Sequence, residues 1–282
     1  MLTCDQYHMP TTLSEALALL RAAPEGSRLV AGATDILPWA REGRAGNVHL
    51  PAMIDLSRVG ELSGYTIADG RVRLGANVVY QQFLTDDTLR RHLPCMPFCS
   101  VWFADDQIRE QATLAGNVVN ASPAADSVPA MVAAGAVARI AGPDGVRDLA
   151  VIDVPQGPGK TALARGEFIA SILLPARGAR SGDAYLRFIP RTEMDIAVVG
   201  CGVSLGLDEE DRVTAARVAL GAVGPKVMLV EEAAQAITGR VLDAAALDGL
   251  FDLAKARPVS RLGYLDYGLP PEIVSIPRPT GD

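Results

Sequence analysis

The 282-residue chain is poor in the residues that nucleic-acid binding and zinc coordination require. It carries 26 basic against 33 acidic residues, a net charge of −7, and only 5% aromatic residues. Nucleic-acid binding needs a basic face and, for single strands, aromatic stacking platforms, so we expect no nucleic-acid partner. Its three histidines, His8, His49 and His92, are isolated from one another, and no zinc-ligand spacing is present.

Cysteine is equally scarce. Cys4, Cys95, Cys99 and Cys201 contain no C-x-x-C motif. Cys95 and Cys99 would share one face of a helix, but no further ligands lie near them in the sequence. We therefore interpret all four as reduced, partly buried thiols, and we expect no metal or iron–sulfur centre on this chain.

Long hydrophobic segments are also absent. The longest uninterrupted apolar run covers residues 128–138, well short of the roughly 18 residues that a membrane span requires. The N-terminal residues lack the basic and apolar regions of a signal peptide, and Thr12 and Glu15 instead match a helix capping box. We expect a cytoplasmic protein without a membrane span.

The remaining composition is that of a globular protein, with 49% hydrophobic residues. Apolar spacing predicts helices at 12–23, at 128–136 and, interrupted by prolines, over 80–103. Strands are predicted early in 28–38, in 47–59 and in 166–175, and hairpins turning at 69–70 and 142–145. From about residue 177, strand-like runs at 183–189, 195–208 and 212–223 precede helical runs at 229–239 and 242–256, which predicts a separate α+β domain.

Two loops of glycine and alanine, in residues 29–36 and 113–120, are candidates for ligand binding. Small residues let a ligand approach the main chain, where successive N–H groups form an anion-binding nest. Thr34, Thr113 and Asn117 add neutral donors, so the two loops together predict diphosphate binding without lysine. Neither loop is a Walker A or a G-x-G-x-x-G motif, and either one alone can be an ordinary turn.

The loops and their flanks occur in a characteristic order: "LVAGATDILP", "IDLSRVGEL", "VRLGANVVYQQF", "WFADDQIREQATLAGNVVNASPAADSVPAMVA", "GEFIASILLP", "AYLRFIPRTEMDIAVVG" and "ARVALGAVGPK". Together they resemble the FAD-binding medium subunit of the molybdenum hydroxylases, a family that includes xanthine, carbon monoxide, aldehyde and N-heteroaromatic dehydrogenases. The resemblance extends to about residue 240.

This resemblance implies an α+β fold with two parts. The first, residues 1–176, would be a two-subdomain FAD-binding unit of the vanillyl-alcohol-oxidase (PCMH) type, with subdomains at about 1–58 and 59–176. The second, residues 177–282, would be a smaller α+β C-terminal domain of the CO dehydrogenase flavoprotein type.

The resemblance also implies which residues bind FAD. The two loops would hold the pyrophosphate and ribityl, Phe103 would pack near the flavin, and Ile169 would lie along the cofactor. Asp126 matches a family cofactor contact, and Arg187 takes a position that can carry Lys. The predicted cofactor-binding set is Leu29, Val30, Ala31, Gly32, Ala33, Thr34, Asp35, Ile36, Phe103, Thr113, Leu114, Ala115, Gly116, Asn117, Asp126, Ile169 and Arg187.

The residues themselves leave other roles open. Asp126 precedes a helical run and can be its N-cap, Phe103 can be a core residue, and Asp35 can cap a turn or accept a cofactor hydroxyl. Arg187 can be a solvated strand residue or can stabilise reduced flavin by Coulomb attraction. We interpret Arg109 as a structural residue that pairs with a neighbouring aspartate, Asp105 or Asp106.

Two alanines depart from the family pattern. Ala33 replaces the second glycine of the common A-G-G-T sequence, and Ala115 replaces the first glycine of G-G-N. A methyl group fits these positions at negative φ. A positive φ would cost on the order of 1 kcal/mol or shift the loop.

By resemblance, this chain is an electron-transfer subunit. Its FAD would take electrons from the [2Fe–2S] centres of a small partner subunit, after a large molybdopterin subunit oxidises substrate, and pass them to NAD⁺, quinone, O₂ or another acceptor. A dimer of heterotrimers is expected, and no catalytic residue is predicted because the cofactor performs the redox chemistry. The alternatives are a stand-alone flavin oxidoreductase, a non-catalytic nucleotide-binding module, and a structural subunit that has lost its flavin.

Overall fold

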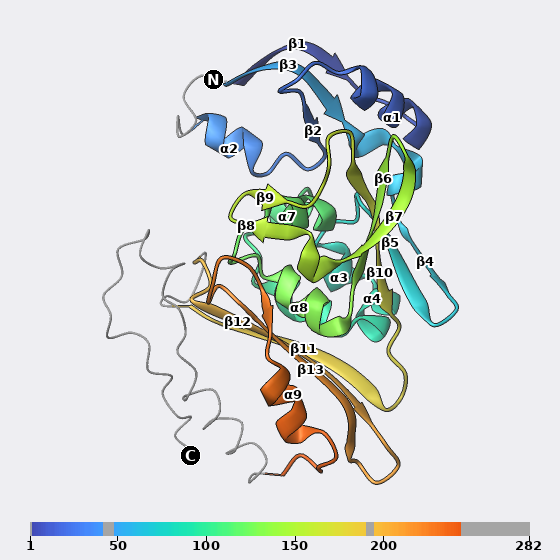
Figure 1. Ribbon diagram of the computed structural model, residues 1–282, viewed down its shortest axis with the longest axis vertical. Helices are drawn as coiled ribbons and strands as arrows, with labels where there is room; N and C mark the ends of the chain where they lie inside the picture. The colour runs from blue at the N-terminus through green and yellow to red at the C-terminus, as the bar shows by residue number, and fades with distance from the viewer. Residues whose placement is uncertain (1, 42–47, 190–194, 244–282) are drawn as a thin grey trace.

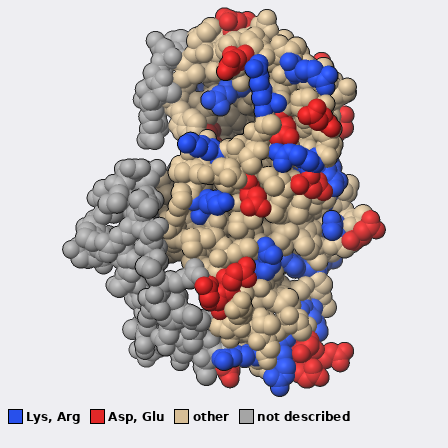
Figure 2. All heavy atoms as spheres, in the orientation of Figure 1, with Lys and Arg blue, Asp and Glu red and all other residues tan. Residues whose placement is uncertain are grey.

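The computed structural model describes residues 2–41, 48–189 and 195–243. The three larger of its four described sheets follow one another along its long axis, from the N-terminal strands at one end to the C-terminal sheet at the other (Figure 1). On the face drawn in Figure 2, charged side chains of both signs are interspersed. Within the described residues, no helix is long and apolar enough to cross a membrane.

The first sheet is parallel and three-stranded, in the order β1-β3-β2. Its elements are β1 (Leu2–His8), α1 (Leu13–Ala22), β2 (Arg28–Val30), α2 (Ile36–Arg41) and β3 (Val48–Asp55). Helix α1 begins as predicted: the Thr12 hydroxyl accepts from the Glu15 N–H, and the Glu15 carboxylate accepts from the Thr11 N–H. This sheet fixes the chain direction at the end of β2, where the first loop begins.

The second sheet is antiparallel and five-stranded, in the order β4-β5-β10-β6-β7. Its strands are β4 (Tyr65–Ala68), β5 (Arg71–Gly75), β6 (Val137–Gly142), β7 (Gly145–Ala150) and β10 (Phe168–Pro175). Both predicted hairpins are confirmed. Asp69 and Gly70 have φ values of 50° and 68°, the left-handed pair that a tight hairpin turn requires. Short elements η1 (Leu56–Arg58), η2 (Gly60–Leu62), η3 (Val151–Asp153), β8 (Pro155–Gly157) and β9 (Lys160–Thr161) complete this part.

Helices occupy the long connection between β5 and β6. They are α3 (Gln82–Thr85), α4 (Asp87–His92), α5 (Cys95–Val101), α6 (Asp106–Arg109), α7 (Leu114–Asn120) and α8 (Ser127–Ala134). The predicted helical run over 80–103 is divided into three short helices because Asp86 caps α4, accepting from two N–H groups, and Pro94 follows that helix. All eight residues of α8 are buried, so this helix lies in the centre of the molecule.

The third sheet is antiparallel, in the order β11-β12-β13-β14. It comprises β11 (Ser181–Phe188), β12 (Val199–Leu207), β13 (Val213–Gly221) and β14 (Met228–Leu229), followed by α9 (Glu231–Ile237). The sheet packs against α8, where a Cβ on Gly202 would lie 2.3 Å from the Pro129 carbonyl oxygen. The three predicted strands and the first predicted helix are confirmed; the predicted helix over 242–256 falls almost wholly outside the described residues.

Candidate cofactor-binding site

The two glycine- and alanine-containing loops line one cleft of about 320 Å³. The first loop connects β2 to α2, and the second leads into α7. The residues that line the cleft are Arg28, Leu29, Val30, Ala31, Gly32, Ala33, Thr34, Asp35, Ile36, Trp39, Ala40, Val48, Leu50, Phe103, Ala112, Thr113, Gly116, Asn117, Val119 and Asn120. The structure thus brings together segments about 80 residues apart, as the sequence predicted.

Close main-chain contact brings the two loops together at Gly32. A Cβ on this residue would lie 2.1 Å from the Gln111 carbonyl oxygen and 3.2 Å from the Ala112 Cα. Only glycine lacks this atom, so only glycine allows the first loop to approach the segment that precedes Thr113. The cleft wall therefore depends on the absence of a side chain at residue 32.

The first loop presents unpaired main-chain donors. In the part of the chain that the structure describes, the N–H groups of residues 32–35 donate to no protein acceptor, whereas the Ala33 and Asp35 carbonyls accept from Leu37 and Trp39. Ala33 has a φ of 53°, a left-handed conformation. Successive free N–H groups around a left-handed residue form an anion-binding nest. The Ala33 methyl group is thus held at a positive φ, which costs on the order of 1 kcal/mol.

The second loop starts helix α7. Thr113 is its N-cap: the hydroxyl accepts from the Gly116 N–H at 3.1 Å, and the Leu114 N–H donates to the Val78 carbonyl. Ala115 lies inside the helix, is buried, and is not among the described residues of positive φ. The alanine replacement in this loop therefore causes no backbone strain, in contrast to Ala33.

Phe103 lies between the cleft and the hydrophobic core, and its packing against the flavin stays a prediction. It lines the cleft, and its ring stacks on Tyr80 with centroids 3.9 Å apart and planes inclined by 1°. The segment that carries it is held by Arg109, which donates to the Phe103 carbonyl at 2.9 Å and forms an ion pair with Asp106. The predicted structural role of Arg109 is confirmed.

Charge is sparse in the cleft. Of the described residues that line it, Arg28 is the one cation and Asp35 the one anion. Burial raises the pKa of the half-buried Asp35 carboxyl group. A diphosphate in this cleft would therefore be bound mainly by main-chain N–H groups and neutral side chains.

Several predicted site residues lie elsewhere. Leu114, Ala115 and Ile169 are buried and do not line the cleft. Asp126 and Arg187 form an ion pair of 2.8 Å between side chains that are only 8% and 6% exposed, and the Tyr185 hydroxyl donates to Asp126 at 2.6 Å. Roles of these five residues in cofactor binding stay predictions.

The pair between Asp126 and Arg187 decides how the two alternative interpretations stand. Asp126 occupies the N-cap position of α8 but makes no side-chain cap bond there, and Arg187 is buried and not solvated. Burial raises the pKa of Asp126, although Tyr185 and Arg187 act in the opposite direction. The pair joins the N-terminus of α8 to β11, so its visible role is to fix the third sheet onto that helix.

Some cleft residues lie outside the predicted cofactor-binding set. Trp39 and Ala40 lie on α2, three and four residues beyond the first loop, and Val119 and Asn120 lie on α7 at the end of the second loop, two and three residues after Asn117. Continuing the predicted set by one helical turn in each loop includes them, because residues three and four apart share a helix face.

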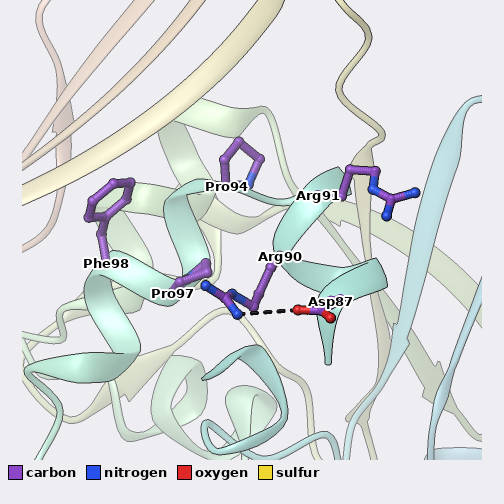
Figure 3. A pocket seen from close by; sticks show the side chains of 6 residues that line it. All are labelled: Asp87, Arg90, Arg91, Pro94, Pro97 and Phe98. Atoms are coloured by element: carbon purple, nitrogen blue, oxygen red, sulfur yellow. Dashed lines mark hydrogen bonds and ion pairs between the residues drawn. The ribbon is translucent and has the colours of Figure 1, made fainter. Parts of the chain in front are cut away.

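A second, open concavity of about 470 Å³ lies on α4 and α5, away from both loops (Figure 3). It is lined by Asp87, Arg90, Arg91, Pro94, Pro97 and Phe98. Arg90 forms an ion pair with Asp87 at 3.2 Å, and the Arg91 side chain points away from this pair. None of the predicted cofactor-binding residues lines this concavity.

The fold agrees with comparisons to known proteins. Residues 3–177 match the family model described as "FAD binding domain in molybdopterin dehydrogenase", and residues 184–259 match "CO dehydrogenase flavoprotein C-terminal domain". The chain belongs to this family of FAD-binding dehydrogenase subunits, and its cofactor is FAD. The fold is that of an FAD-binding unit followed by a C-terminal domain.

Individual relatives include two bacterial subunits. The chain is 30% identical to the "Putative xanthine dehydrogenase FAD-binding subunit XdhB" of Escherichia coli strain K12, with 86% of this chain and 82% of the relative covered. It is 32% identical to the "Carbon monoxide dehydrogenase medium chain" of Afipia carboxidovorans, with 89% and 85% covered. A crystal structure of Cu,Mo-CO dehydrogenase in a cyanide-inactivated form matches with a TM-score of 0.83 at 30% identity, covering 91% of this chain and 88% of that one.

Proposed function

We propose that this chain is the FAD-carrying electron-transfer subunit of a molybdenum hydroxylase complex. The observation that carries the proposal is the single cleft lined by both loops, with Gly32 against the main chain of Gln111. Relatives named as FAD-binding subunits and medium chains of xanthine and carbon monoxide dehydrogenases support the assignment.

The donors of the cleft fit the cofactor. The free N–H groups of residues 32–35 suit the FAD pyrophosphate, and Asn117 adds a neutral side chain beside it. Bound FAD supplies the redox chemistry, while the chain binds it, orients it and limits its contact with water. The half-buried Asp35 carboxylate is suited to accept a hydrogen bond from a hydroxyl group of the cofactor, because its negative charge would repel a phosphate.

The proposal extends to partners and domains. A small [2Fe–2S] subunit would deliver electrons, and a large molybdopterin subunit would oxidise substrate, in a dimer of heterotrimers. The electron acceptor would be NAD⁺, quinone, O₂ or another compound. The FAD-binding domain would comprise residues 1–176, with subdomains at about 1–58 and 59–176, and the C-terminal domain residues 177–282.

Absorption spectroscopy of the complex purified after co-expression with its neighbouring genes tests the proposal. We expect flavin bands, together with iron and molybdenum in the complex. Steady turnover by the isolated chain would favour a stand-alone flavin oxidoreductase. A colourless chain that FAD cannot reconstitute would favour a different nucleotide ligand or a structural subunit.

Gly116→Val tests the second loop within the same assay. A Cβ on Gly116 would lie 2.7 Å from the Thr113 hydroxyl oxygen, so the variant disrupts the start of α7 and is expected to lose FAD. The matched control is Gly182→Val in β11, where a Cβ meets no atom within 4 Å. Unchanged flavin content in Gly116→Val would remove the second loop from the site.

A further inference from the structure

Tyr80 is a buried residue that contacts two walls of the cleft without lining the cleft itself. It follows β5 and precedes α3 in the chain and is fully buried. Its ring stacks in parallel on the Phe103 ring, with the two ring centroids 3.9 Å apart. Its hydroxyl donates to the Ser127 hydroxyl at 2.7 Å, and the Ser127 hydroxyl donates to the Asn117 side-chain carbonyl at 2.9 Å. Phe103 and Asn117 both line the cleft.

The direction of these hydrogen bonds fixes the orientation of the Asn117 amide. A hydroxyl has one proton to donate. Because the Ser127 hydroxyl oxygen accepts the hydrogen bond from Tyr80, Ser127 uses its own proton to donate to Asn117 Oδ1. Asn117 Nδ2 then has no hydrogen-bond acceptor among the described residues, and this half-buried residue can offer both N–H groups to the cleft.

The tyrosine holds its proton firmly. Burial raises the pKa of Tyr80 well above its ordinary value, and Cys99, Asp126 and Asp35 act in the same direction, whereas the hydrogen bond with Ser127 acts in the opposite direction. The Tyr80 hydroxyl therefore keeps its proton near neutral pH and can donate a hydrogen bond to Ser127. Replacement by phenylalanine would keep the ring and remove only this donor.

We propose that Tyr80 and Ser127 are positioning residues for FAD, which orient the Asn117 amide so that it donates to an acceptor oxygen of the cofactor. Tyr80 also holds the Phe103 ring flat against the same cleft. The proposal rests on FAD binding in this cleft and adds two residues that do not touch the cofactor. It predicts that the effects of removing the two hydroxyl groups pass through Asn117.

A double-mutant cycle on FAD affinity tests the proposal. Dissociation constants are measured by flavin fluorescence on folded chain for Tyr80→Phe, Ser127→Ala, Asn117→Ala and the pairs Tyr80→Phe/Asn117→Ala and Ser127→Ala/Asn117→Ala. Each single variant is expected to weaken binding by about three- to tenfold, the usual effect of one hydrogen bond. In the Asn117→Ala background, the second change is expected to have no further effect.

Two controls separate orientation of Asn117 from general loss of structure. Tyr65→Phe removes a hydroxyl that donates to Asp86 at 2.8 Å outside the cleft, and it should leave FAD affinity unchanged. Tyr80→Leu removes the stacked ring as well, and its visible circular dichroism should differ from that of Tyr80→Phe. Thermal unfolding identifies variants that must be measured at lower temperature.

The outcomes distinguish this proposal from the proposed function. If wild-type chain binds FAD and the changes at Tyr80 and Ser127 weaken binding additively with Asn117→Ala, the positioning role is overturned and the function stands. The same holds if Tyr80→Phe and Ser127→Ala bind FAD as wild type does. If wild-type chain binds no FAD, both proposals are wrong.

Discussion

Gly32→Ala is the sharpest test of the cleft, because it adds a single methyl group where the two loops meet. The new Cβ would lie 2.1 Å from the Gln111 carbonyl oxygen and 2.8 Å from its carbonyl carbon. Non-bonded heavy atoms normally approach to about 3.5 Å, so the two main chains must separate by more than about 1 Å. No side chain can rotate away to relieve this contact, since both obstructing atoms are main chain.

The expected cost follows from this geometry. Overpacking of this kind costs about 1–3 kcal/mol, and we expect the free energy of unfolding to fall by that amount. A separation of about 1 Å also lengthens hydrogen bonds beyond their useful range of about 3.2 Å. FAD must then either bridge the wider cleft or force the loops together, so its affinity should fall at least tenfold, about 1.4 kcal/mol.

The assay combines urea unfolding with titration of FAD into the apoprotein, followed by flavin fluorescence. Gly60→Ala is the matched control, because a Cβ at Gly60 meets no atom within 4 Å and its φ is not in the left-handed region. That variant should resemble wild type in both measurements. Wild-type stability and FAD affinity in Gly32→Ala would refute the close approach of the loops.

Three further predictions concern the backbone and the ion pairs. Ala33→Gly removes the strain of a left-handed alanine, about 1–2 kcal/mol, but it raises the conformational entropy of the unfolded chain, which costs about 0.4–1 kcal/mol of stability. Urea unfolding should therefore show a net increase in the free energy of unfolding of about 0.5 kcal/mol, and a decrease would contradict this reasoning. Arg187→Met leaves Asp126 buried without its cation, so the free energy of unfolding should fall by about 3 kcal/mol at pH 7. The loss should be smaller at pH 5, because burial raises the pKa of Asp126 and a neutral carboxyl group needs no cation. Equal losses at the two pH values would be inconsistent with this reasoning. The hydrogen-bonded Arg147 lowers the pKa of Glu167 to about 2. The ionised Glu167 therefore stabilises the fold above its ordinary pKa of about 4.5, and this stabilisation disappears as the pH falls toward 2. In Glu167→Gln, stability followed by circular dichroism should depend less on pH over that interval than in the wild type.

Local sequence chemistry predicted much of the fold. The Asp69-Gly70 turn, the Thr12 cap and the strand-then-helix order of the C-terminal part were readable because each depends on neighbouring residues. Strand β1 was missed because none of its residues is buried and its alternation is weak. The two-residue β14 is too short to leave a period, and only its pairing with β13 defines it.

The site was predictable where it is made of loops, and less so where it depends on distant contacts. Both loops carry their signal in glycine, alanine and threonine. The sequence gives no indication that Arg187 pairs with Asp126, 61 residues away, or that Tyr80 reaches Ser127, 47 residues away. Such partners are set by how β11 and α8 pack, which no short pattern encodes. The sign of φ at Ala33 likewise follows from the geometry of its loop.

Helix α8 has a consequence for any attempt to divide the chain. The third sheet covers it through the Gly202 contact, and Arg217 and Arg177 donate to its Val132 and Ala134 carbonyls at 3.0 Å. A fragment cut near residue 177 would leave an eight-residue apolar helix bare on one side and Asp126 without its cation. We expect such a fragment to aggregate on expression, so shortened versions of this subunit should keep β11 to β13.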